Sequence, residues 1–328
     1  MLDMPEKPGH SSYSLVDYHL DEVRHKYVAR KSNYLIQQSS YTLPADEQKI
    51  MVALISRIKP KQNDLVVDFN AKNFVKALGL RNSGTNTRHI ATALQDIENH
   101  SFWLKDPDSK HHTKRILLPW FENVIQDPDD VGDTNHFRVT FEKKLRGFLL
   151  HVSRLYTDVT LSTVMAMQSG YSPRLYEYFR SYKYTQTKSG LNYTVNELKR
   201  ALNLIYRDKH THKPIEINGH VKYKYPRFAD FNRKVLKPAI KEINAYSPYT
   251  VKANKYREGR RVAGITVHMK KKTVKQLNHA TFNSVNKINH THITFKDAYE
   301  GHLFDKLDCP RGKNPRNYVK KWAWQNGN

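Results

Sequence analysis

The stretch that most constrains the fold is residues 225–244, YPRFADFNRKVLKPAIKEIN. At about 100° per residue, this stretch separates into an apolar side and a charged side, as an amphipathic helix does. The apolar side carries Phe228, Phe231, Val235, Leu236, Ala239 and Ile243, and the charged side carries Arg227, Asp230, Arg233, Lys234, Lys237 and Lys241. Pro226 suits the first helical position, where a missing N–H costs nothing. We therefore expect a helix with its back in a core and a mostly cationic face toward solvent.

One residue interrupts this pattern. Pro238 lacks the N–H of a helix hydrogen bond and should kink the helix. The apolar spacing continues beyond it to Ile243, so we expect one bent helix rather than two helices.

The next stretch, residues 249–269, reads as two strands joined by residues 257–260, REGR. Gly259 supplies the permissive backbone of a tight turn. Four cations gather at this tip, namely Lys255, Arg257, Arg260 and Arg261. A cationic helix followed by a basic hairpin is typical of the winged-helix plan, in which the helix enters a major groove and the hairpin lies on phosphates. By itself, the charged face of the helix would be interpreted as a solvated surface, as most charged helix faces are, and it is the hairpin that follows which favours DNA binding.

The distribution of charge supports a polyanionic partner. The 328 residues, enough for two domains and a tail, hold 55 Lys and Arg against 31 Asp and Glu, a formal net charge of +24. Residues 165–275 hold 25 basic and 7 acidic side chains, whereas residues 1–164 hold 22 and 20. Such concentration favours nucleic acid over a membrane, and we see no long apolar run. The single cysteine, Cys309, excludes a disulfide framework, and the polar start lacks a signal peptide, so we expect a cytoplasmic protein.

Upstream of residue 156, the pattern reads helix, strand, helix, turn, helix and hairpin. Helices are expected near residues 44–58, 70–79 and 85–99, with a strand at 65–69 and a hairpin of residues 102–104 with 115–120. A further strand is expected at residues 136–141 and a joining helix at 142–155. This order predicts a first winged helix, whose outer face is weakly charged.

The second half repeats the order of elements with little sequence identity. Ser172-Pro173 opens a helix, and Thr194 with Glu197 matches a capping box. A long polar loop over residues 205–225 then leads to the cationic helix. The predicted class is α+β, with two tandem winged-helix domains. We expect a mobile arm over residues 1–32, domains over 33–155 and 156–272, and a tail of unassigned fold over 273–328.

Several segments resemble the iteron-binding plasmid replication initiators. The resemblance rests on YSPRLYEYFRSYKY (residues 171–184), VNELKRALNL (195–204), FADFNRKVLKPAIKEIN (228–244) with its basic hairpin, and NYLIQQSSYTLPADEQKIMVALISRI (33–58). It covers roughly residues 33–272, and the family helix resembles this one in carrying a proline at position 238. The resemblance implies two winged helices that bind directly repeated origin DNA, the second dominating. It also implies monomers that initiate and dimers that repress their own promoter. The tail beyond Lys275 is longer than the usual family pattern and is a candidate segment for interaction with host replication proteins.

The resemblance places recognition residues on Arg227, Asp230, Arg233, Lys234 and Lys237, and wing residues on Lys255, Arg257, Arg260 and Arg261. Arg227 and Arg233 are candidates to pair with guanine, and the lysines, with Lys241, to neutralise phosphates. Asp230 either accepts a hydrogen bond from a cytosine amino group or orients the side chain of Arg227 or Lys234. We favour the second role, because DNA phosphates repel a carboxylate. In the first half, Arg88 and Thr92 are candidate contacts or a solvated face.

Two other classes of protein remain as alternatives. A transcriptional regulator would share the fold and differ only in the location of its target. A rolling-circle nickase needs a pair of metal-binding histidines and a nucleophilic tyrosine. The chain offers His210-Thr-His212 and His290-Thr-His292, but neither pair has an apolar centre residue. No phosphate-cradling GxxxxGK[ST] motif occurs. We therefore expect a non-enzymatic protein with no cofactor and no metal.

Overall fold

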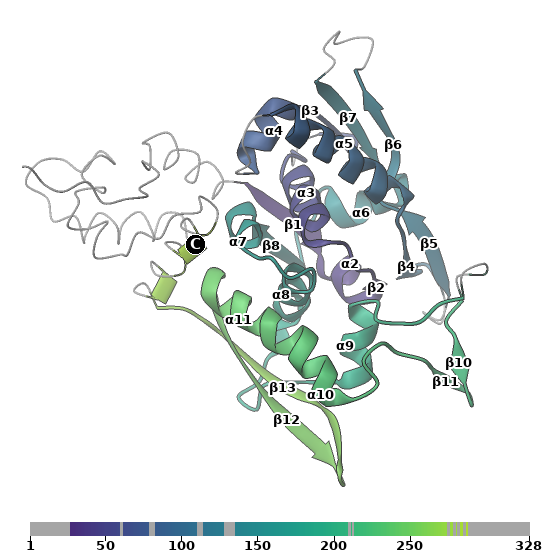
Figure 1. Cartoon of the computed structure of the whole chain (residues 1–328), viewed down its shortest axis with the longest axis vertical. Coiled ribbons are helices and arrows are strands. Elements are labelled where there is room, and N and C mark those ends of the chain that lie inside the picture. The colour runs from purple at the N-terminus through teal and green to yellow at the C-terminus, as the bar shows by residue number, and fades with distance from the viewer. Residues whose placement is uncertain are drawn as a thin grey trace, which may run out of the picture.

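The computed structural model describes residues 27–59, 62–78, 83–109, 114–127, 135–208, 211 and 213–273, together with the single positions 276, 277, 280, 283, 284 and 287. Two groups of helices and strands lie one above the other in Figure 1. We call residues 27–149 the first half and residues 156–273 the second half. No helix among the described residues is both long and apolar enough to cross a membrane.

Up to residue 141, the first half contains the predicted elements in the predicted order, together with some that were not predicted. Its helices are α2 (Asn33–Gln38), α3 (Ala45–Ile55), α4 (Ala71–Ala77) and α5 (Gly84–Asn99), and its strands are β1 (Val28–Ser32), β2 (Ser39–Ser40), β3 (Val66–Asn70), β4 (Ser101–Lys105), β5 (Arg115–Pro119), β6 (Phe121–Gln126) and β7 (His136–Phe141). The unpredicted elements are α2, β1, β2 and β6. They form two antiparallel sheets, ordered β2-β4-β5 and β3-β7-β6. α5 buries Ile90, Leu94 and Ile97 at helical spacing. The predicted hairpin after α5 is confirmed as β4 with β5.

The second half places a cationic helix beside a three-stranded sheet. Its elements are β8 (Tyr156–Thr160), α7 (Leu161–Met165), α8 (Ser172–Ser181), η2 (Lys183–Thr185), β9 (Leu191–Thr194), α9 (Val195–Ala201), β10 (Glu216–Ile217), β11 (His220–Val221), α10 (Phe228–Phe231), η3 (Asn232–Leu236), α11 (Lys237–Tyr246), β12 (Tyr249–Glu258) and β13 (Arg261–Lys271). The sheet order is β12-β13-β9. The capping box of Thr194 and Glu197 is confirmed at the start of α9.

Pro238 is accommodated without ending the helix. Residues 228–246 run continuously through α10, η3 and α11, and η3 is a π-helical segment just before the proline. A π-helix shifts the hydrogen bonds to residues five apart, which provides for the N–H that proline lacks. The buried side chains Phe231, Val235, Ala239 and Ile243 stay on one side throughout. The expected single helix is confirmed, and its irregularity is a π-helical segment.

The first strand corrects the predicted arm. Val28–Ser32 forms β1, which pairs antiparallel with β8 from Tyr156 to Thr160. Residues 28–32 are therefore part of the folded body, and the rest of the predicted arm lies outside the described residues. The pairing joins the beginning of the first half to the beginning of the second.

Two connecting segments also differ from prediction. The joining helix expected over residues 142–155 is only a 3-10 turn, η1 (Lys143–Leu145), followed by one helical turn, α6 (Arg146–Leu149). The expected loop over residues 205–225 contains the small hairpin β10–β11. In the tail, buried Ser284 donates a hydrogen bond to the Tyr246 carbonyl at 3.3 Å, so this part of the chain contacts the end of α11.

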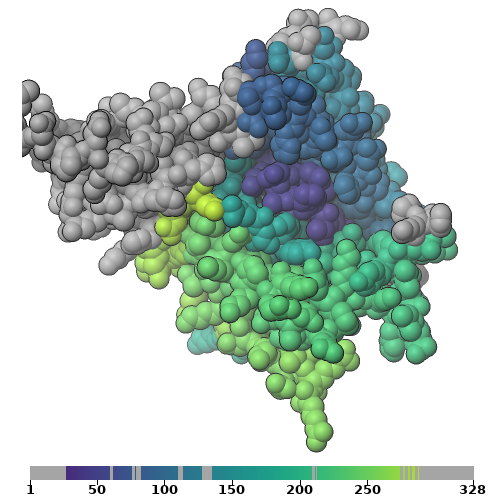
Figure 2. Space-filling model, viewed as in Figure 1, coloured from purple at the N-terminus to yellow at the C-terminus, as the bar shows by residue number. Residues whose placement is uncertain are grey.

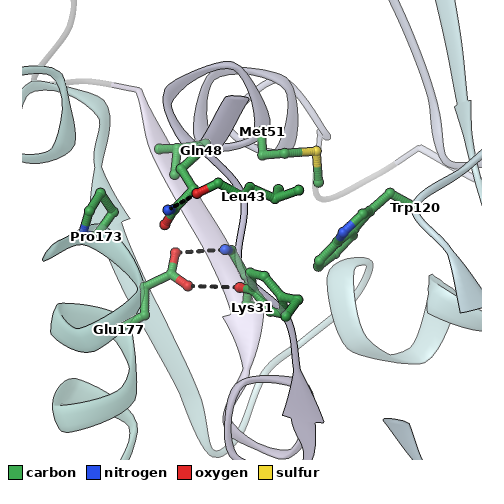
Figure 3. Close-up of a pocket in the computed structure, with 9 residues that line it drawn as sticks. Lys31, Leu43, Gln48, Met51, Trp120, Pro173 and Glu177 are labelled. Carbon is green, nitrogen blue, oxygen red and sulfur yellow. Dashed lines mark hydrogen bonds and ion pairs between the residues drawn. The ribbon is translucent and has the colours of Figure 1, made fainter. Parts of the chain in front are cut away.

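A buried polar network holds the halves together (Figure 3). The Lys31 ammonium on β1 lies 2.6 Å from the Glu177 carboxylate on α8, and both side chains are almost fully buried. The Tyr41 hydroxyl donates to the same carboxylate at 3.2 Å. Burial is the largest single influence and lowers the pKa of Lys31, but the charge of Glu177, the nearby Tyr41 and the hydrogen bond to Glu177 together outweigh it and raise that pKa above its ordinary value. Lys31 therefore keeps its charge inside the protein.

Arg174 connects the same elements. Its side chain has no exposed surface and lies 4.1 Å from the centre of the Tyr41 ring. The guanidinium donates to the carbonyls of Ile36 at 2.8 Å and Ser39 at 3.0 Å in the first half. It also donates to the Ala201 carbonyl at 3.3 Å in α9. One rigid, permanently charged fork thus fixes α9 relative to α2 and β2.

Candidate nucleic-acid interface

The cationic face of the α10–α11 helix is open to solvent. Arg227 is the residue that precedes α10, and the charged residues of the helix follow at intervals of three or four. The exposed members are Arg227, Arg233, Lys234, Lys237 and Lys241, and Asp230 is half-buried. In Figure 2 this green segment lies on the surface toward the viewer, and α5 reaches the same side of the molecule. The sequence pattern thus predicted which side of this helix faces solvent, and five of the six charged residues on that side are exposed.

Asp230 is held by a residue other than the two we expected. The Arg233 guanidinium donates to the Asp230 carboxylate at 3.0 Å, one turn along the helix. An ion pair this exposed contributes little stability, but it limits the rotamers of the arginine. Asp230 therefore orients Arg233, and our expectation that Arg227 or Lys234 was its partner is wrong.

Lys234 and Lys199 are supported by aromatic rings and backbone near the start of the helix. The Lys234 ammonium lies 5.6 Å from the centre of the Tyr225 ring. Lys199, which is buried on α9, donates to the Tyr225 carbonyl at 2.7 Å. Tyr225 itself has a positive φ of 54°. Burial, followed by the nearby Arg261 charge, lowers the pKa of Lys199. These contacts hold the entrance to the helix against α9.

The wing is a long hairpin whose tip carries the predicted cations. Glu258 pairs with Arg261 across a two-residue turn, and Gly259 there has a φ of +59°. Lys255, Arg257, Arg260 and Arg261 are all exposed. The Arg257 guanidinium donates to the Arg260 carbonyl at 2.9 Å, which stiffens the tip. Figure 2 shows this tip projecting from the lower end of the body.

Gly264 sets how the wing joins its third strand. β13 pairs with β9 through Gly264 opposite Thr194. A Cβ at position 264 would overlap the Tyr193 carbonyl and lie 2.6 Å from the Tyr256 ring. Only glycine leaves room for this close approach of strand and ring. The wing therefore has a defined direction relative to α9.

The two candidate DNA contacts of the first half are on α5, on a different element from the cations of the α10–α11 helix and the wing. Arg88 and Thr92 are exposed on α5. The Arg88 side chain donates only a long bond, 3.4 Å, to the Gly84 carbonyl of its own helix. α5 begins at Ser83, whose hydroxyl accepts from the Asn86 N–H at 3.3 Å. Their role as DNA contacts stays a prediction.

A second group of cations was not singled out from the sequence. Arg115 on β5, Arg200 on α9 and Arg207 just beyond α9 lie close enough to influence one another. They are separated by up to 92 positions in the chain, and no spacing rule links a strand of one domain to a helix of another. Only the basic character of residues 165–275 pointed toward two of them.

The histidine pairs considered for nicking, 210 with 212 and 290 with 292, lie outside the described residues. Within the part of the chain that the structure describes, no group of three or more His, Cys, Asp or Glu side chains could hold a metal ion. Tyr176, Tyr178 and Phe179 are buried, and Tyr182 is half-buried and packs against Tyr178 and Tyr193. These aromatic residues belong to the core rather than to a surface on which bases could stack.

Comparison with known proteins relates this arrangement to two domain families. The family model described as "Initiator Replication protein, WH1" matches residues 28–180, and the one described as "Initiator Rep protein, WH2" matches residues 216–269. The PI protein of Escherichia coli is 29% identical over 136 residues. That match spans 41% of this chain and only 42% of the length of that relative.

A solved structure of a replication initiator resembles this one in fold. The crystal structure of Pi initiator protein in complex with iteron DNA matches with a TM-score of 0.54 and 20% identity, covering 76% of this chain and 98% of that chain. Domains 2 and 3 of RctB match with a TM-score of 0.40 and 14% identity, covering 69% of this chain and 82% of that chain. The predicted α+β class with two winged-helix domains is confirmed by the family models. Because the two models together match well over half of its residues, the chain belongs to the family of initiator replication proteins built from WH1 and WH2 domains.

Proposed function

We propose that this protein binds directly repeated DNA, or iterons, at a plasmid replication origin and initiates replication there. The observation that carries the proposal is the solvent-exposed cationic face of the α10–α11 helix beside a basic wing. The sequence motif of that helix, the match to initiator families, and a relative crystallised with iteron DNA support it. The protein acts by binding, without catalytic residues or a cofactor, in the cytoplasm where the replicon lies.

Within this proposal the helix and the wing have different tasks. Arg227 and Arg233 pair with guanine edges in the major groove, because arginine is the residue best suited to that contact. Asp230 holds Arg233 in position for it. Lys234, Lys237 and Lys241 neutralise phosphates, and so do Lys255, Arg257, Arg260 and Arg261 on the wing. Phosphate contacts set register and supply most of the affinity.

The two halves divide the work. Residues 156–272 act as the main DNA-binding domain, since residues 165–275 hold 25 basic against 7 acidic side chains. Residues 33–155 add contacts through Arg88 and Thr92 in the monomer and form the homodimer interface. The dimer represses the protein's own promoter, and host replication proteins are recruited at the origin.

A mobility-shift experiment tests the proposal. The purified chain is titrated onto fragments of its own replicon that contain one, two or more direct repeats, at two salt concentrations with competitor DNA. Discrete complexes whose number increases with the number of repeats, and which survive competitor, are expected. A matched fragment with shuffled repeats should bind only non-specifically.

Two results would contradict it. A single complex on an inverted repeat near a promoter would indicate a transcriptional regulator instead. Complexes that disappear with competitor would leave only a basic protein, and the recognition roles of Arg227 and Arg233 would be lost with them.

A further inference from the structure

Three arginines from both halves lie near the end of α9, where Arg115 is close enough to Arg200 and to Arg207 to influence them electrostatically. Arg115 comes from β5 of the first half, Arg200 from the last turn of α9, and Arg207 from the segment that follows α9. Arg115 and Arg200 are exposed, and Arg207 is half-buried. None of these three residues lies on the α10–α11 helix or on the wing.

Hydrogen bonds hold the backbone around the three arginines in place. The Ser40 hydroxyl of β2 donates to the Arg200 carbonyl at 2.6 Å. β2 pairs with β4, and β4 pairs with β5 so that Lys105 faces Arg115. This sheet therefore ties β5, the strand that carries Arg115, to the end of α9.

Two side-chain contacts complete the cluster. The Arg200 guanidinium donates to the Tyr223 hydroxyl at 3.2 Å. The Arg207 guanidinium donates to the Asn203 side-chain oxygen at 3.4 Å. Ile205 bridges to Tyr223, and Arg207 bridges to Pro214, which keeps the segment after α9 close to Tyr223. The cluster is thus built on both halves and does not depend on a single loose loop.

The charges in this cluster are of one sign. Arg30 and Arg233 each lie against a carboxylate, at 2.8 Å and 3.0 Å, but among the described residues neither Arg115 nor Arg200 forms an ion pair. Burial and the neighbouring arginine lower the pKa of Arg115, and burial and Arg115 lower that of Arg207. Arginine stays protonated even so. Placing like charges together costs free energy, which an anion between them would recover.

We propose that Arg115, Arg200 and Arg207 form one binding site for a phosphate of the DNA backbone, located at the seam between the two winged helices. Guanidinium groups bind phosphate oxygens through paired N–H donors, and the Tyr223 hydroxyl adds a further donor. The site lies on α9, the helix that also supports the start of α10 through Lys199. In this proposal, a DNA backbone held by the α10–α11 helix continues toward the first half across the three arginines.

This inference rests on the proposed DNA-binding function but can fail separately from it. The variant Arg115→Ala/Arg200→Ala removes two of the three charges without touching the α10–α11 helix or the wing. The control Lys59→Ala/Arg154→Ala removes two exposed cations elsewhere on the chain. Affinity is measured over a range of salt concentrations on a repeat fragment and on its shuffled version, with phosphate-ethylation interference on the repeat fragment.

The cluster variant should lower the slope of log affinity against log salt by about one for one lost phosphate. The loss should be equal on both DNAs, because a phosphate contact carries no base information. One ethylation-sensitive phosphate should vanish, and the control should retain it. Arg115→Lys/Arg200→Lys should keep most of the slope because it keeps the charges.

An unchanged slope and an unchanged ethylation pattern in a folded cluster variant would overturn the inference. Folding is checked by the melting temperature, and if the alanine pair unfolds, Arg115→Gln/Arg200→Gln, which removes the same two charges but keeps long polar side chains, takes its place in both measurements. If wild-type protein binds both DNAs equally, the proposed function fails. The slope comparison still tests the phosphate site in that case, since it does not require sequence preference.

Discussion

The buried ion pair between Lys31 and Glu177 offers a sharp test of how the halves are joined. The perturbation is Glu177→Gln, which keeps the size of the side chain and an acceptor for Tyr41 but removes the negative charge. Lys31 is then left as a cation with 4% exposure, near the equally buried Arg174. A buried charge that has lost its partner is costly because no solvent replaces the missing interaction.

The magnitude follows from the burial of both partners. Breaking a fully buried pair costs about 3–5 kcal/mol, which lowers the melting temperature by roughly 10 °C in a protein of this size. The matched control lies one residue earlier on β1. Arg30 pairs with Asp158 at 2.8 Å, but the side chains are 43% and 32% exposed. Asp158→Asn should therefore cost only about 0.2–1 kcal/mol.

The assay is thermal and urea unfolding of wild type, Glu177→Gln, Lys31→Met and the double variant. Since the double variant no longer buries an unpaired ammonium, it should be more stable than Glu177→Gln alone. The coupling between the two sites should be about 1–3 kcal/mol. Additive costs, or a loss for Glu177→Gln no larger than for Asp158→Asn, would refute the reasoning.

Three further predictions concern the cationic helix, the wing and the pH dependence of stability. Arg233→Ala should weaken binding to the cognate repeat by about 1–3 kcal/mol and relax base preference in a mobility-shift assay; equal weakening on every DNA would make Arg233 a phosphate contact. Arg257→Ala/Arg260→Ala should lower the salt slope by about one for each lost phosphate contact, and an unchanged slope would remove the wing from the interface. Lys272 donates to the Asn244 and Ser247 carbonyls at 2.6 and 2.7 Å, yet burial lowers its pKa from 10.5 to about 8. The unfolded chain then binds the extra proton between these values, so stability relative to Lys272→Met should rise by about 1 kcal/mol from pH 8 to pH 10. Parallel pH profiles of the two proteins in urea unfolding would contradict this shift.

Much of the interface could be predicted because its signals are local. Apolar residues at helical spacing define the buried side of the α10–α11 helix, so its charged residues had to face solvent. Thr194 and Glu197 act within one turn of helix, and Gly259 permits a turn between adjacent strands. The partner of Asp230 was missed because Arg227, Arg233 and Lys234 all lie within one turn of it, and only the rotamers decide among them.

Contacts between distant segments could not be predicted in the same way. β1 reads as a polar stretch, VARKS, and becomes a strand because β8, about 130 positions later, pairs with it. β6 was likewise hidden, since its side chains are mostly exposed and its partner is β7. A strand needs a partner for its backbone groups, and the choice of partner depends on the whole fold.

By itself, the sequence determined the two winged helices, the cationic helix and the basic wing, because periodicity, capping and turn residues act over a few positions. The tertiary structure alone decided how the two halves are joined. Arg174 finds its carbonyl acceptors in α2, β2 and α9, and Lys31 finds Glu177, only after the chain has folded. The same holds for the meeting of Arg115, Arg200 and Arg207. Burial and the proximity of charges depend on which residues are neighbours in three dimensions. When such neighbours are far apart in the chain, no spacing of residue types in the sequence predicts that they will be close.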